Sequence, residues 1–198
     1  RGRGDPSGCL PGKAASVPAR RTLVARAHLR QDSRPRKPHR VTTLADPGTV
    51  EIRAAGHLDL ERLSLVGRAT FLETYAETVD GEDVLRYCEE GHSAAAYAAL
   101  LREPGARAWL AETVAVRAPV GCVLVTGGRL PGTTADDVEV RRLYVLHPYH
   151  GRRLGRELLQ RAIDAARLAG AARLVLGVYS VNGQALAFYE RMGFERIG

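Results

Sequence analysis

The chain has 198 residues, of which 45% are hydrophobic and 26% charged, so its length and composition fit one globular domain with its own core. No apolar run approaches the roughly 18 residues that a membrane-spanning helix requires, and the three cysteines, Cys9, Cys88 and Cys122, lie too far apart to indicate a disulfide framework or a zinc site. The net charge is +7, but residues 1–40 hold eleven Lys/Arg and two Asp/Glu, which leaves a balance of −2 for the rest.

The first forty residues form a basic segment rich in Arg, Pro and Gly. Apart from a short apolar run from Leu23 to Leu29, it has no hydrophobic periodicity. Such a composition buries too little apolar surface to offset the entropy of ordering the chain. We therefore expect residues 1–48 to be a disordered arm and residues 49–198 to be the folded domain. An inert tail, a transit peptide and a nucleic-acid-binding arm all fit this composition. Deletion of residues 1–45 is expected to leave melting temperature and function unchanged.

The folded domain is predicted to begin with a strand at 50–53 and a helix over 60–77, with Asp59 as the N-cap. A second helix is expected from Ser93 to Leu101, where Pro104 follows. Short strands at 108–112 and 120–125 come next. The stretch 127–137 is dense in Gly, Pro, Thr and Asp, which is typical of a loop.

The segment 138–145 alternates apolar and polar residues, but the alternation changes parity. Val138 and Val140 occupy even positions, whereas Leu143 and Val145 occupy odd ones. Because a strand repeats every two residues, this change requires one extra residue, so the pattern predicts a β-bulge near Arg141–Arg142. A strand that is buried on both faces near one end would give the same pattern.

After this strand, an apolar stripe predicts a helix to Leu168, with Gly170 as the left-handed residue that ends it. A strongly apolar strand is expected at 174–179. Asn182 is a suitable N-cap for a last helix, which Gly193 ends. The order strand–loop–helix–strand–helix predicts an α/β layer built around a βαβ unit.

The loop that joins the strand 138–145 to its helix has the chemistry of an anion site. The first N–H groups of a helix have no intrahelical partner, and the macrodipole makes that end positive. Gly151 and Gly155 allow the backbone to approach a ligand closely. The loop also carries three positive side chains: Arg152, Arg153 and Arg156. These features suit a pyrophosphate, although an ordinary helix start fits them equally well.

Four motifs follow one another in this region: LYV (143–145), HGRRLG (150–155), Asn182 and AFYERMGF (187–194). In their order and spacing they resemble the GNAT superfamily of acetyltransferases. Upstream, TFLETYAE (70–77) and WLAE (109–112) look like its polyamine-acetylating members, as does LGVYSVN (176–182). The resemblance implies an α/β fold with a mixed, mostly antiparallel central sheet and helices on both faces. It also implies two further strands after Gly193, so we expect a C-terminally truncated domain.

The resemblance implies that acetyl-CoA is the co-substrate and that its acetyl-pantetheine arm lies along Leu143, Tyr144 and Val145. The backbone that would wrap the pyrophosphate comprises His150, Gly151, Arg152, Arg153, Leu154, Gly155 and Arg156. Asn182 would hydrogen-bond the cofactor. The loop of the family usually reads Gln/Arg-x-x-Gly-x-Gly/Ala, whereas here Arg153 replaces the middle Gly. If this position requires a positive φ, Arg153 is strained.

The resemblance also implies catalytic roles for Tyr189 and Glu139. An alkylamine is mostly protonated at pH 7, so a carboxylate such as Glu139 would have to accept its proton before attack. The departing thiolate needs a proton, which the phenol of Tyr189 can supply. Other interpretations remain open: Tyr189 as part of the core, Glu139 as a structural or substrate-binding carboxylate, and Asn182 as a plain helix cap.

The predicted function is therefore transfer of an acetyl group from acetyl-CoA to a primary amine in a ternary complex, in the cytoplasm. The alternatives are a non-catalytic acyl-CoA-binding or sensory domain with the same fold, and a nucleic-acid-binding protein that uses the arm. The expected partner is a small-molecule amine, with a polyamine and a homodimer left open; no membrane, nucleic-acid or metal partner is expected. Without the final strands, the strand 174–179 would keep an unpaired edge and the chain would self-associate.

Overall fold

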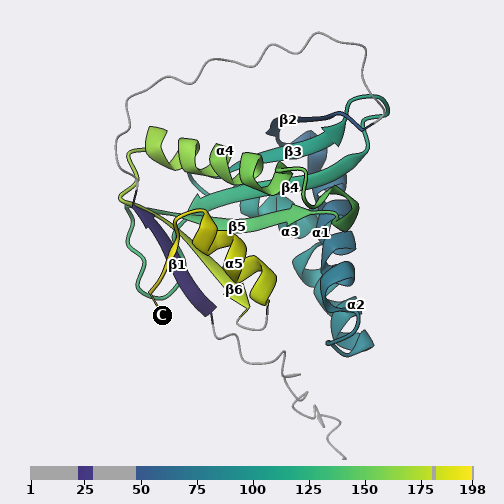
Figure 1. The fold of residues 1–198 in the computed structure, drawn as a ribbon, viewed down its shortest axis with the longest axis horizontal. Coiled ribbons are helices and arrows are strands. Elements are labelled where there is room, and N and C mark those ends of the chain that lie inside the picture. Colours follow the sequence, from purple (N-terminus) through teal and green to yellow (C-terminus); the bar gives the residue numbers. More distant parts are fainter. Residues whose placement is uncertain (1–21, 29–47, 180–181, 198) are drawn as a thin grey trace, which may run out of the picture.

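The computed structural model describes residues 22–28, 48–179 and 182–197. Within them, a seven-stranded sheet runs in the order β2-β3-β4-β5-β6-β1-β7 (Figure 1). All neighbouring strands are antiparallel except β5 and β6, so the predicted mixed, mostly antiparallel sheet is confirmed. The strands are β1 (Thr22–His28), β2 (Val50–Ala55), β3 (Arg107–Thr113), β4 (Pro119–Gly127), β5 (Asp137–Val145), β6 (Arg173–Tyr179) and β7 (Glu195–Arg196).

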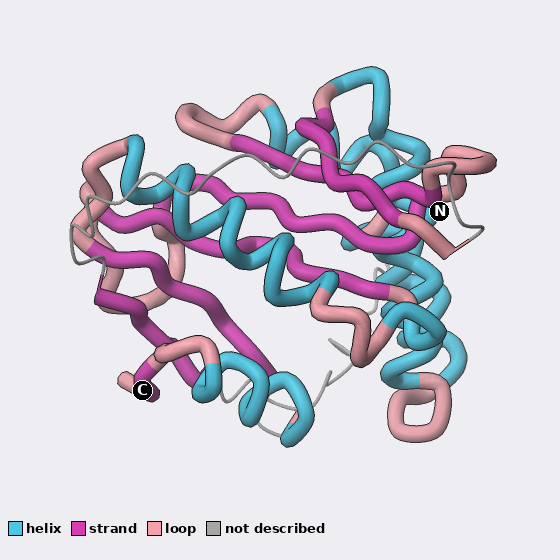
Figure 2. Tube along the Cα trace, turned by 45° about the horizontal axis from the view of Figure 1, so that its top comes forward, coloured by secondary structure: helices cyan, strands magenta, loops and turns pink. Residues whose placement is uncertain are grey.

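Helices cover both faces of the sheet (Figure 2). They are η1 (His57–Asp59), α1 (Leu60–Tyr75), α2 (Gly81–Gly91), α3 (Ala94–Leu101), η2 (His147–Tyr149), α4 (Leu154–Leu168) and α5 (Gly183–Arg191). One core packs α4 and α5 against β3 to β6, around Leu158 and Leu176. The other packs α1 and α3 against β3 and β4, around Leu63 and Leu124. None of the described helices is long and apolar enough to cross a membrane.

Most of the predicted helix ends are confirmed. The Ser93 hydroxyl accepts the Ala96 N–H at 3.1 Å and so caps α3. Gly170 and Gly193 follow α4 and α5 with φ values of 69° and 85°, the left-handed conformation expected of them. Asp59 occupies the predicted N-cap position of α1, but its side chain makes no capping hydrogen bond to that helix. Its carboxylate instead accepts the Gly56 N–H at 3.1 Å and pairs with Arg53 at 2.6 Å.

The sequence did not predict α2. Its N-cap is Asp80, whose carboxylate accepts the Glu82 N–H at 3.0 Å. Val84 is the residue of this helix that is fully buried, and most of the others are charged or exposed. Its inward face is short, with Val84, Tyr87 and Cys88 at helical spacing, and it was overlooked among the charged residues around it.

The strand β1 lies inside the segment that was expected to be a disordered arm, and the prediction that residues 1–45 can be deleted without effect assumed that no strand lies there. It pairs with β6 over all seven residues, from Thr22 opposite Tyr179 to His28 opposite Arg173. Its far side pairs with β7. The expectation of an unpaired edge at 174–179 is therefore wrong, and with it the reason for expecting self-association. The rest of the arm, 1–21 and 29–47, lies outside the described residues.

The predicted bulge in β5 is confirmed. Val140 lies opposite Val125 and Arg142 opposite Leu124, so Arg141 is the extra residue. The bulge keeps Val138 and Val140 on the α4 side of the sheet together with the odd-numbered Leu143 and Val145. Pairing with β6 stops at Val140, and beyond that point the two strands diverge (Figure 1).

Candidate functional site

The segment 143–145 of β5 has one paired and one free edge. It pairs with 121–123 of β4, but no described strand pairs with it on the β6 side. Leu143 and Val145 belong to the core under α4, whereas Tyr144 points to the opposite face, toward α1 and α3. Because strand backbone without a partner pairs readily with an extended ligand, this edge suits the acetyl-pantetheine arm expected there.

The loop between β5 and α4 leaves a run of backbone N–H groups available. The N–H of His150 is already used, because it donates to the His147 carbonyl at 3.0 Å, and the His150 ring Nε2 bonds the Val145 carbonyl at 2.9 Å. His150 therefore closes the end of β5 and offers no free backbone donor. From Gly151 to Arg156, no backbone N–H finds an acceptor among the described residues.

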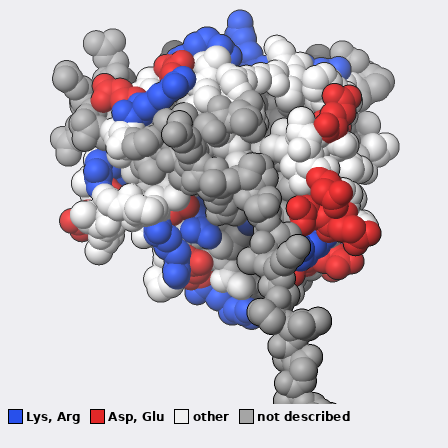
Figure 3. Space-filling model, turned by 90° about the horizontal axis from the view of Figure 1, so that it is seen from below, with Lys and Arg blue, Asp and Glu red and all other residues white. Residues whose placement is uncertain are grey.

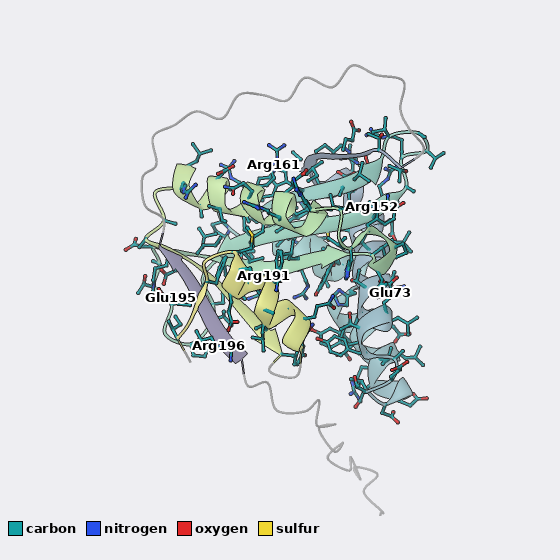
Figure 4. All side chains as sticks on the ribbon, in the orientation of Figure 1. Glu73, Arg152, Arg161, Arg191, Glu195 and Arg196 are labelled. Carbon is teal, nitrogen blue, oxygen red and sulfur yellow. The ribbon has the colours of Figure 1, made fainter. Side chains whose placement is uncertain are left out.

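Charge and conformation around this loop also suit an anion. Gly151 has a φ of 78°, which turns the chain into the start of the 15-residue helix α4. The Arg152 guanidinium lies 5.1 Å from the centre of the Tyr149 ring. Figure 4 places Arg152 at the helix start and Arg161 further along α4. Successive unpaired N–H groups at the positive end of a helix form an anion site.

Arg153 is held in the left-handed conformation, with φ of 64° and ψ of 2°. This is the strain expected if the loop requires a positive φ where the family resemblance places a glycine. The residue immediately precedes α4 and makes no side-chain cap hydrogen bond to it. The left-handed conformation therefore costs free energy at Arg153 that it would not cost at glycine.

Arg153→Gly is expected to stabilise the fold by about 0.5–1 kcal/mol, because it removes a left-handed penalty that the chain entropy of glycine only partly cancels. Urea unfolding of the wild type, Arg153→Gly and Arg153→Ala measures this. The alanine variant loses the charge but keeps the strain, so it should gain nothing. Equal stability of the wild type and the glycine variant would show that the position is not strained.

The helix α5 lies against the start of α4. A Cβ placed on Gly155 would lie 3.7 Å from the ring of Phe188, an ordinary contact distance. Asn182 caps α5, because its side-chain oxygen accepts the Ala185 N–H at 3.0 Å. Its side-chain nitrogen has no partner among the described residues, so the predicted cofactor contact and the cap are compatible.

Tyr189 is half-buried between two aromatic rings of the α5 region. Its ring centre lies 5.2 Å from that of Phe188 and 5.7 Å from that of Phe194. Burial, and secondarily Tyr75 on α1, raise the pKa of Tyr189 well above its ordinary value. Its hydroxyl therefore keeps its proton at neutral pH, as a proton donor must.

Glu139 is buried on the face of the sheet opposite α4, two residues before the bulge residue. One carboxylate oxygen accepts the Arg129 N–H at 2.8 Å, and the other lies 3.3 Å from the Arg141 guanidinium. This carboxylate thus anchors the loop that precedes β5. Both the structural interpretation and the role of proton acceptor fit its placement next to the bulge.

A continuous group of aromatic rings fills the seam between α1, α2 and the diverging strands. Neighbouring rings lie between 4.4 and 5.6 Å apart, and the group comprises Tyr179, Tyr75, Phe71, Tyr87, His92 and Tyr144. Burial, and then Arg142, lower the pKa of His92 to about 3, so His92 is neutral. The sequence carries no pattern that predicts this group, because its members come from five separate segments with no common spacing.

Acidic side chains are exposed along part of α1, on α2 and in the turn between them. Figure 3 shows them gathered on the side of the molecule where α1 and α2 lie. The exposed members on these two helices and the turn between them are Glu73, Glu77, Asp80, Glu82, Glu89 and Glu90. Glu73 (Figure 4) also accepts the N–H of His147 at 3.0 Å and so connects α1 to the segment between β5 and α4. No group of three or more potential metal ligands occurs among the described residues.

A sequence profile of the acetyltransferase (GNAT) family matches residues 70–194 of this chain. An uncharacterised N-acetyltransferase of Mycobacterium tuberculosis (strain ATCC 25618 / H37Rv) is 30% identical over 137 residues, which is 69% of this chain and 83% of the relative. An uncharacterised N-acetyltransferase of Escherichia coli (strain K12) is 32% identical over 97 residues, 48% of this chain and 54% of that protein.

Solved acetyltransferase structures share the fold. The PaiA N-acetyltransferase of Thermoplasma acidophilum, in complex with coenzyme A, superposes with a TM-score of 0.64 at 24% identity over 74% of this chain and 90% of its own. AAC(6')-Iy, in complex with a bisubstrate analogue of CoA and acetylneamine, gives a TM-score of 0.52 at 15% identity over 76% of this chain and 94% of its own.

Proposed function

The chain belongs to the acetyltransferase (GNAT) family, and from that premise we propose that it transfers an acetyl group from acetyl-CoA to a primary amine by direct attack in a ternary complex. The proposal rests on two neighbouring features of the backbone, one on each side of His150. One is the free edge of 143–145, and the other is the run of unpaired N–H groups from Gly151 to Arg156. An extended thioester arm that ends in a pyrophosphate needs both.

In this proposal the backbone of Leu143, Tyr144 and Val145 pairs with the pantetheine arm, and the start of α4 holds the pyrophosphate. Arg152, Arg153 and Arg156 add positive charge, and the side-chain amide of Asn182 contacts the cofactor. A strand N–H next to the acetyl carbonyl would stabilise the oxyanion that develops during attack.

The amine nitrogen forms a bond to the acetyl carbon, and the carbon–sulfur bond breaks. An ammonium group loses two protons in becoming an amide, and the departing thiolate gains one. We assign the proton lost before attack to Glu139, directly or through water, and the proton gained by the thiolate to Tyr189, which the second nitrogen proton restores. Tyr189 suits this role because its phenol, whose pKa is raised by burial, is protonated at neutral pH and carries a proton to donate.

The acceptor that suits this site is a cationic amine, and a polyamine is the candidate. The exposed carboxylates of α1 and α2 attract positive charge toward the aromatic seam. Tyrosine faces stabilise ammonium groups by about 0.5–2 kcal/mol each. A cation with two or more amino groups could leave one charge near Glu73 or Glu77 while another nitrogen attacks.

One observation favours a second function, a non-catalytic acyl-CoA-binding domain. The strained Arg153 occupies the position where the family loop carries glycine, which weakens the case for tight cofactor binding and turnover. Thiol release from acetyl-CoA distinguishes the two functions when it is measured with a panel of diamines, polyamines, aminoglycosides and amino acids. Turnover with diamines and polyamines supports the proposal. Cofactor binding by calorimetry without turnover on any amine would replace it with the binding function.

Glu139→Gln is expected to lower kcat by roughly 100-fold or more at pH 7. The amide still accepts the Arg129 N–H but takes up no proton, so the remaining activity should rise with pH as the free amine deprotonates by itself. Glu103→Gln is the matched control, because Glu103 also bonds Arg129, through its Nε at 2.9 Å. Equal kcat in wild type and Glu139→Gln would leave Glu139 with a structural role.

We propose a reducing compartment, the cytoplasm, as the location of the protein. The cysteines that the structure describes, Cys88 and Cys122, are free thiols, which suits a reducing compartment such as the cytoplasm. A small-molecule amine is the proposed partner. A homodimer remains part of the proposal and is tested by sedimentation of the purified chain at several concentrations.

A further inference from the structure

We propose that the gap between β6 and β7 is a strand-binding site, that the chain's own β1 is its occupant, and that occupancy holds α5 in position for acetyl transfer. The last part rests on the function proposed above. Without β1, the neighbouring strands would present unpaired backbone to any other extended segment.

The sheet topology makes two elements depend on β1. β7 pairs with β1 and with no other described strand. β6 pairs with β5 only through 173–176, so β1 is the sole described strand partner of Gly177, Val178 and Tyr179. Removing β1 would therefore free the C-terminal part of β6 and all of β7 together.

These two elements hold the ends of the segment that carries the proposed catalytic group. At one end, the ring of Tyr179 meets the ring of Tyr75 at 5.5 Å. At the other end, Phe194 is buried and its N–H donates to the Tyr189 carbonyl at 3.0 Å, immediately before β7. Figure 4 places Glu195 and Arg196 beside β1. β1 thus pairs with the strands at both ends of α5, the helix that carries Tyr189.

The chain can fill this site with its own strand. Four strands separate β1 from β2 in the sheet, a lateral distance of about 24 Å at the usual strand spacing. The 21 residues between His28 and Val50 can extend over roughly 70 Å. A strand on such a tether has an effective concentration on the order of millimolar, which favours it over the strand of a second copy.

A disulfide tests the occupant and the register in the full chain. Val24 lies opposite Gly177, so Val24→Cys with Gly177→Cys, in a Cys9→Ser background, should form an intrachain disulfide on mild oxidation. Val24→Cys with Val178→Cys is the matched control, because neighbouring residues of a strand point to opposite faces. Intrachain linkage of the first pair alone supports the proposal. Equal linkage of both pairs, or linkage between chains, would overturn it.

Ala25→Pro tests the effect on the site, since Ala25 pairs with both Leu176 and Arg196. Proline removes a ladder hydrogen bond, whereas the control Ala25→Val favours the strand. We expect the proline variant to lose about 5 °C or more in melting temperature and at least tenfold in kcat, with little change for the valine variant. An unchanged melting temperature would refute the strand site. A lower melting temperature with unchanged kcat would refute the link to α5, and failure of the wild type to acetylate any amine would count against the proposed function instead.

Discussion

Replacing Tyr189 with Phe is expected to lower kcat by roughly 10- to 1000-fold, the contribution of one positioned general acid. The substitution keeps the ring, and so keeps its contacts with Phe188 and Phe194. Folding stability should therefore change little while the proton donor is lost. The measurement is kcat at saturating substrates under conditions where acetyl transfer limits the rate, together with the melting temperature.

Tyr97→Phe is the matched control for this variant. Tyr97 is completely buried on the other face of the sheet, where its hydroxyl lies 3.4 Å from His92 Nδ1. Loss of this hydroxyl removes a weak buried contact and no proposed catalytic group. Because the pKa of Tyr189 is raised, its proton stays in place as pH increases from 7 to 9, and wild-type activity should not fall over that range through this group. A wild-type kcat for Tyr189→Phe would leave Tyr189 with a packing role only.

Gly155→Glu is expected to weaken acetyl-CoA binding by at least about 100-fold, which corresponds to about 2.7 kcal/mol. Gly155 lies in the first turn of α4, where the backbone N–H groups have no acceptor among the described residues. A carboxylate there would neutralise the positive end of the helix and occupy the space of the pyrophosphate. Calorimetric titration with acetyl-CoA and with CoA measures the Kd.

Two further substitutions at Gly155 separate size from charge. Gly155→Ala adds a Cβ whose nearest neighbour lies 3.7 Å away, so it should fold and bind nearly normally. Gly155→Gln has the volume of glutamate without its charge and should fall between the other two. An unchanged Kd for Gly155→Glu would contradict the assignment of this loop to the cofactor.

Local patterns in the sequence predicted much of the fold. The parity change between Val140 and Leu143 located the bulge, because a strand has a fixed period of two. Gly170, Gly193, Ser93 and Asn182 marked helix ends, because each supplies a conformation or an oxygen that a helix terminus requires.

Features that depend on contacts between distant segments could not be predicted in the same way. The pairing of Ala25 with Leu176 joins residues 151 positions apart, and the run Leu23–Leu29 shows nothing of its partner. The side chain of Asp59 does not cap α1 because its carboxylate forms an ion pair with Arg53 on the neighbouring strand β2. At the site, the motifs indicated the loop 150–156, but only the structure shows that the His150 N–H is already bonded and that Arg153 has a positive φ.

The divergence of β5 from β6 after Val140 opens the sheet so that both of its faces can be reached at one point. If acetyl-CoA enters from the side of α4 and α5, and the amine from the side of α1 and α2, neither substrate occupies the place of the other. A thiol-free CoA analogue would then inhibit competitively against acetyl-CoA but not against the amine. Raising the amine concentration would not relieve that inhibition, and either substrate could bind first.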